Sequence, residues 1–85
     1  MAQLVEYPIW REFQGGSTVL KLVPADNDDH ALIAAAMAVR DALEDEMAQY
    51  SDMITVLRPS GDPICAAAEA SEFVKRYAPQ APADN

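Results

Sequence analysis

The sequence is poor in the residues that build metal sites and disulfides. It contains one cysteine, Cys65, and one histidine, His30, so the chain can form neither an internal disulfide nor a cysteine–histidine zinc site. A lone thiol is typical of proteins kept in a reducing compartment. We therefore expect a cytoplasmic protein that holds no metal and needs no cofactor.

Long hydrophobic runs are also missing. The longest nearly uncharged stretch covers residues 31–39, far short of the ~20 apolar residues that a membrane-spanning helix needs. The chain begins MAQLVE, without a basic residue or a long apolar segment, so we expect no signal peptide.

Basic residues are scarce as well. Six Lys and Arg stand against 14 Asp and Glu, which gives a net charge of −8. The segment from Asp26 to Asp52 has eight of the acids and a single base, Arg40, and so carries nearly all of this imbalance. Nucleic acids and anionic membranes are disfavoured ligands, because both bind through Lys and Arg. A partner protein with a basic surface is the expected binding target.

The chain is too short for more than one domain. Of its 43 apolar residues 16 are alanines, which leaves 27 larger side chains to build a core. We expect a single compact domain over residues 1–78, followed by a disordered, Pro-rich tail over residues 79–85. A core this small gains stability from association, so we expect a homodimer or a bound partner.

Hydrophobic periodicity predicts five elements in the order ββαβα. They occupy residues 4–13, 18–23, 28–50, 53–57 and 63–77. The first strand alternates, with Val5, Tyr7 and Ile9 on one parity, and Pro8 predicts that it lies at a sheet edge or a bulge. The glycines of residues 14–17 predict a hairpin turn to a second, more central strand.

Capping residues predict where the helices begin. Asn27 and the acids beside it are good N-cap and first-turn residues for the long helix, which the periodicity extends to Tyr50. Asp62 as N-cap and Pro63 at the first helical position predict the start of the last helix.

Together these elements predict an α+β fold with a three-stranded sheet, made of the N-terminal hairpin and one further strand. A right-handed crossover places the long helix on one sheet face, and the last helix packs on the same face. Whether the third strand pairs with the first or the second stays open. The other face is then bare and carries Trp10 and one parity of the second strand. A bare apolar face on a small domain usually marks an interface.

Cys65 admits two interpretations. At the third position of the last helix its thiolate would be favoured by the helix N-terminus, and His30 could act as its base. Alternatively, Cys65 is a small apolar residue that fills the core. The loop of residues 58–62, with Arg58, suggests an anion site only weakly, because it has a single glycine and its Asp62 would repel an anion.

Two groups of residues are candidates for binding a partner. The first is an acidic cluster near the end of the long helix, formed by Asp41, Glu44, Asp45 and Glu46. Carboxylates oppose the helix dipole there, which suggests a use in binding, although a solvated surface explains them too. The second group is Trp10 with Arg11, since both residue types are enriched at binding hot spots.

The favoured function is a small, acidic, non-enzymatic protein-binding module, such as an accessory subunit or an inhibitor of the kind that phages and mobile elements encode. It would act through the acidic helix and the exposed sheet face. Two alternatives stay open: a thiol-dependent or small-molecule-binding protein that uses Cys65, and a purely structural homo-oligomer. No motif in the chain is specific enough to assign a catalytic residue or a metal ligand.

Overall fold

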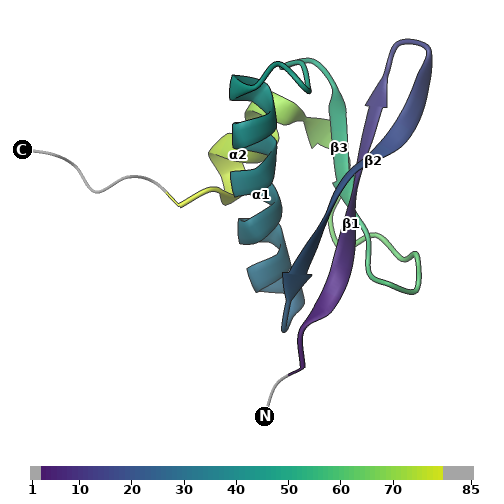
Figure 1. Cartoon of the computed structure of the whole chain (residues 1–85), viewed down its shortest axis with the longest axis vertical. Coiled ribbons are helices and arrows are strands. Elements are labelled where there is room, and N and C mark those ends of the chain that lie inside the picture. Colours follow the sequence, from purple (N-terminus) through teal and green to yellow (C-terminus); the bar gives the residue numbers. More distant parts are fainter. Residues whose placement is uncertain (1–2, 80–85) are drawn as a thin grey trace, which may run out of the picture.

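The computed structural model describes residues 3–79, which form four strands and two helices (Figure 1). The elements are β1 (Val5–Phe13), β2 (Gly16–Ala25), α1 (Asp28–Glu44), β3 (Met53–Val56), β4 (Ala68–Glu69) and α2 (Ala70–Tyr77). The strands form one antiparallel sheet in the order β2-β1-β3-β4, and both helices cover the same face of it. Apart from Pro79, the predicted tail lies outside the described residues.

The α+β class and the placement of both helices on one face are confirmed. The predicted strand count is wrong, because the two-residue strand β4 pairs with β3 and makes the sheet four-stranded. The third predicted strand, β3, pairs with β1 and not with β2. Consequently β1 is a central strand and β2 is an edge strand, whereas the second strand was expected to be the more central one. Of the two alternatives that Pro8 gave for β1, the edge position is wrong, and the bulge is found next to it, at the register shift between Ile9 and Trp10.

Pro8 is tolerated in a central strand because of where its missing donor points. The Leu57 N–H donates to the Pro8 carbonyl over 3.0 Å. In an antiparallel strand the N–H and C=O of one residue point to the same neighbour, so the absent N–H of Pro8 faces the end of β3. Pairing of β1 with β3 runs only from Ile9 to Glu12, so Pro8 lies just beyond that ladder.

The core lies between the sheet and the two helices. Its largest fully buried side chains are Phe73, Ile9, Ile54, Val39 and Val56. The inner side of α1 is lined mainly by alanines, which let the helix approach the strands closely. Phe73 anchors α2, with its ring centroid 4.9 Å from that of Tyr77.

Helix α1 ends at Glu44, six residues before the predicted end at Tyr50. The Met47 N–H donates to the Ala42 carbonyl over 2.8 Å, and the Glu46 N–H donates to the Leu43 carbonyl over 3.3 Å. This pair of bonds is the Schellman pattern that closes a helix, and it requires a left-handed residue. Glu46 takes that role with φ of 60°, where glycine is the usual residue. The periodicity continued past the helix because Met47 and Tyr50 are apolar, yet both side chains are exposed.

Helix α2 begins at Ala70 and not at Pro63 as predicted. The chain instead turns back on itself, with Leu57 bridged to Pro63 and the Gly61 N–H donating to the Arg58 carbonyl over 2.8 Å. Pro59 follows Arg58, and Gly61 has φ of 100°, as in a three-residue hairpin loop with a left-handed glycine. This turn chemistry outweighs the helix propensity of the alanines that follow.

Replacing Glu46 by glycine should stabilise the protein by about 1 kcal/mol, because glycine adopts the left-handed conformation without a steric cost. The change would appear as a higher urea midpoint in equilibrium unfolding. Glu46→Gln is the control, since it removes the same charge and keeps the backbone strain. Equal stability of the two variants would show that the left-handed conformation at this residue costs nothing.

Candidate functional site

The face of the sheet opposite the helices is uncovered by any described element (Figure 1). Successive residues of β1 point to opposite faces, and Tyr7 and Ile9 are buried in the core. Pro8 and Trp10 therefore lie on the open face. This placement agrees with the prediction that the bare face carries Trp10.

The strand register gathers apolar side chains around Trp10. Trp10 lies opposite Val19 of β2 and Thr55 of β3, and the next row across the sheet is Leu22, Pro8 and Leu57. These six residues form what we call the apolar band. Leu22 is 45% exposed and Val19 is 41% exposed, although both are large hydrophobic residues in a strand. A shallow hollow of about 340 Å³ lies beside the indole, lined by Trp10, Glu12, Ser17, Thr55, Leu57 and Pro63.

Carboxylates border the apolar band at both ends. Glu6 precedes it on β1, and Glu12 follows it. Met53 of β3 pairs with Glu12 of β1 on one side and with Glu69 of β4 on the other. Because directly paired residues point to the same face of a sheet, the side chains of Glu12 and Glu69 both lie on the open face. We call Glu6, Glu12 and Glu69 the acidic rim.

No basic side chain belongs to this face in the described part of the chain. Lys21 lies opposite Ile9, so it points to the helix side, where it lines a hollow with Asp41 and Asp45. Arg58 bonds to a residue of α1. The remaining bases are Arg11, on the core side of β1, Arg40 on α1, and Lys75 and Arg76 on α2. The open face is therefore apolar in the middle and negative at its ends.

Arg11 does not belong to the same surface as Trp10, because neighbouring strand residues point to opposite faces. Its Nε donates to Oδ2 of Asp52 over 2.6 Å, and its guanidinium lies 4.4 Å from the centre of the Phe13 ring. Asp52 is buried and also accepts a hydrogen bond from the Gln49 N–H over 2.8 Å. Arg11 thus ties β1 to the loop before β3 and is a structural residue.

Asp52 is the one buried charged side chain among residues 3–79. Burial by itself raises the pKa of its carboxyl, but the bond from Arg11, the Gln49 N–H and the Arg11 charge outweigh burial and hold the pKa below its ordinary value. The backbone of Asp52 also accepts the Ala70 N–H over 2.8 Å. Asp52 therefore joins β1, β3 and the start of α2.

The four residues of the predicted acidic cluster line three different hollows at the end of α1. All four residues, Asp41, Glu44, Asp45 and Glu46, are exposed. Asp41 and Asp45 share one hollow with Lys21, whereas Glu44 lines another with Arg40 and Lys75, and Glu46 lines a third. None of the four is in an ion pair among residues 3–79.

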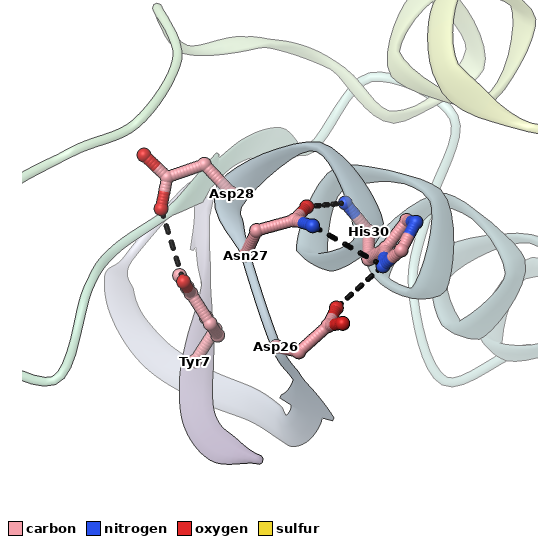
Figure 2. Close-up of polar contacts among 5 residues, drawn as sticks. All are labelled: Tyr7, Asp26, Asn27, Asp28 and His30. Atoms are coloured by element: carbon pink, nitrogen blue, oxygen red, sulfur yellow. Dashed lines mark hydrogen bonds and ion pairs between the residues drawn. The ribbon is translucent and has the colours of Figure 1, made fainter. Parts of the chain in front are cut away.

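At the other end of α1 the capping prediction is confirmed (Figure 2). Oδ1 of Asn27 accepts the His30 N–H over 2.8 Å, and Nδ1 of His30 lies 2.5 Å from Oδ1 of Asp26. The bond with His30 lowers the pKa of Asp26. Among residues 3–79, no group of three His, Cys, Asp or Glu side chains is arranged to hold a metal ion.

Asp28 fastens the start of α1 to the rest of the fold. The Tyr7 hydroxyl donates to its Oδ1 over 3.0 Å, as Figure 2 shows, and Arg58 donates to its Oδ2 over 2.7 Å. The Arg58 bond is the main reason that the pKa of Asp28 is lowered, and burial together with the Asp28 bond raises the pKa of Tyr7. Arg58 is thereby engaged in holding the fold.

Cys65 does not lie at a helix N-terminus. It is half-buried in the loop between β3 and β4, beside the core, and α2 begins five residues later. The predicted position of Cys65 in the first turn of a helix is therefore wrong, and the reactive-thiol interpretation loses the helix N-terminus on which it rested. His30, the base considered in that interpretation, is bonded to Asp26 and Asn27, while the contact of Cys65 with the core fits the alternative of a small apolar residue.

The sequence pattern does not predict that Leu57 and Glu69 lie on the open face. It places Leu57 at the end of the strand over residues 53–57 and Glu69 within the helix over residues 63–77. The alternation of β1 was a sufficient signal for Pro8 and Trp10. The neighbours of these residues across the sheet depend on which strands pair. They also depend on a β-bulge in β2, where Ile9 lies opposite Lys21 and Trp10 lies opposite Val19, so that Leu20 is an extra residue without a partner in β1.

No protein-family model matches the chain, and the comparisons with curated proteins and with solved structures also find no match. In the described part of the chain, neither helix has the length and hydrophobicity needed to cross a membrane.

Asp52→Asn should destabilise the protein by about 2 kcal/mol at pH 7, because it leaves the Arg11 guanidinium without its counter-charge in a partly buried site. Since the folded pKa of Asp52 lies below the ordinary value of 3.8, its contribution is present above about pH 4 and lost as the pH falls through the folded pKa. The stability difference between the two proteins should therefore shrink below pH 4.

Urea unfolding at pH 7 and pH 3 measures this difference. Asp41→Asn removes an exposed carboxylate and is the matched control, with an expected effect below about 0.5 kcal/mol. A difference between wild type and Asp52→Asn that is independent of pH would contradict the ion-pair interpretation.

Proposed function

We propose that this protein is a non-enzymatic protein-binding module, an accessory subunit or an inhibitor, that recognises its partner through the open face of the sheet. The observation that carries this proposal is the apolar band, which lies at the centre of a sheet face that no described element covers. Contiguous exposed apolar surface on a small domain is typical of an interaction site. Trp10 is its expected anchor, since tryptophan fills partner pockets at binding hot spots.

Charge supports a protein partner with a basic surface. The net charge of −8 disfavours nucleic acid, whose affinity comes from Lys and Arg. The acidic rim borders the band directly, whereas the exposed acids at the end of α1 point in several directions. We infer that the rim contributes at close range and that the α1 acids mainly increase the rate of encounter through their long-range field.

The polar clusters favour a binding role over catalysis. Among residues 3–79 the acidic side chains that bond to Arg or His are Asp52 with Arg11, Asp28 with Arg58, and Asp26 with His30. Each of these pairs holds secondary-structure elements together or caps a helix, as described above. With Cys65 away from a helix N-terminus, no specific observation favours the thiol-dependent alternative.

Leu22→Ser should reduce capture of the partner at least tenfold, because it removes an exposed apolar side chain from the apolar band. Met37→Ser is a matched control on α1, since Met37 is 42% exposed and Leu22 is 45% exposed. Trp10→Ala should reduce capture about 30-fold relative to the wild type, which corresponds to the loss of about 2 kcal/mol expected for a hot-spot residue. A tagged chain expressed in its source cells, with the retained proteins quantified by mass spectrometry, measures these ratios.

The three variants must first show the circular dichroism of the wild type. A partner that all three retain equally would place its binding site elsewhere and contradict the proposal. Light scattering of the purified chain over a dilution series tests the structural homo-oligomer. A dimer that Leu22→Ser dissociates would show that the face is occupied by a second copy.

A further inference from the structure

The long edge strand of the sheet, β2, is poorly suited to receive a strand from a partner. The sheet order places β2 at one edge and β4 at the other, and β4 has only two residues with which to pair. Because the Pro8 carbonyl points to β3, the even-numbered residues of β1 direct their backbone groups to β3 and the odd-numbered residues bond with β2. Pro24 lies opposite Glu6, an even-numbered residue, so the backbone of Pro24 faces the solvent at the outer side of β2. Pro24 has no N–H to offer, and the bulge at Leu20 breaks the edge in the middle. The open face is therefore a better docking surface than either edge.

A second copy of the chain is a poor occupant of that face. Two open faces packed together would bring two acidic rims against each other, and no Lys or Arg of residues 3–79 lies on the face to offset them. Like charges in contact across an interface cost binding free energy and select against the wrong partner. The complementary occupant has an apolar surface flanked by Lys or Arg.

The dimensions of the face suit a helix. Glu6 and Glu12 are six residues apart on β1, which separates the two ends of the rim by about 20 Å. A helix with its side chains is about 10–12 Å wide, so it fits between the ends of the rim, and its Lys or Arg side chains can reach the carboxylates. The hollow beside Trp10 can accept one large apolar side chain.

We propose that the open face binds an amphipathic helix of the partner protein, whose apolar stripe lies on the apolar band and whose flanking Lys or Arg residues pair with Glu6, Glu12 and Glu69. The second face of the sheet is thereby covered by a helix supplied in trans, as α1 and α2 cover the first. This inference rests on the proposed function and adds the secondary structure and charge of the partner.

Trp10 allows a direct test, because it is the single tryptophan of the chain. The probe is a synthetic, tryptophan-free helix of about 18 residues, with leucines on one stripe and lysines elsewhere. Binding should shift Trp10 emission to the blue in a saturable manner and weaken as salt is added. A peptide with glutamates in place of the lysines should leave the emission unchanged.

Two triple variants separate the rim from the overall charge. Neutralising the rim by Glu6→Gln, Glu12→Gln and Glu69→Gln should weaken binding of the lysine peptide about tenfold. Neutralising the α1 acids by Asp41→Asn, Glu44→Gln and Asp45→Asn changes the net charge equally and should weaken it less than threefold. Equal losses, or no response of Trp10 to either peptide, would overturn the inference.

The outcome is separable from that of the proposed function. If Leu22→Ser abolishes capture of the cellular partner while the lysine peptide leaves the Trp10 emission unchanged, the face binds a partner surface other than an amphipathic basic helix. If capture is independent of Leu22 and Trp10, the proposed function itself fails.

Discussion

The architecture depends on a sheet that buries only one of its faces. Both helices lie on the same side because α1 crosses from β2 to β3, and α2 returns over that side from the edge strand β4. The core is therefore a single layer of side chains, closed by the alanine-rich side of α1 and by Phe73. Residues 3–79 contain no further helix for the second face. This arrangement leaves the apolar band partly exposed, with Val19 and Leu22 exposed and Trp10 half-buried, and covering it would stabilise a complex in proportion to the apolar area removed from water.

Trp10 and Arg11 illustrate how a period of two separates the roles of neighbouring residues. Trp10 faces outward and is available to a partner, whereas Arg11 faces inward and is bound to Asp52. Asp52 also receives backbone donors from Gln49 and Ala70, so this ion pair holds the loop after α1, β3 and the start of α2 together. The two residues form one motif in the sequence and serve two separate purposes in the fold.

The acidic residues of the chain fall into groups with different roles, which the net charge alone does not distinguish. Asp26, Asp28 and Asp52 are bonded to basic residues and contribute to the fold. The acids at the end of α1 are exposed and line three different hollows. Glu6, Glu12 and Glu69, which are far apart in the sequence, come together at the borders of the apolar band. Charge therefore supports binding chiefly through the acids that the sheet register assembles.

The sequence by itself determined the secondary-structure order up to β3, the N-cap at Asn27 and the outward direction of Trp10. These features follow from alternation, periodicity and local capping, which act within a few residues. Only the tertiary structure decided that β1 is central, that α1 stops at Glu44 and that residues 63–69 complete the sheet. Strand pairing depends on contacts between residues that are distant in the sequence, and such contacts override local propensity. The left-handed turn at Glu46 and the bridge from Leu57 to Pro63 depend on how the chain closes a turn, which hydrophobic periodicity does not report.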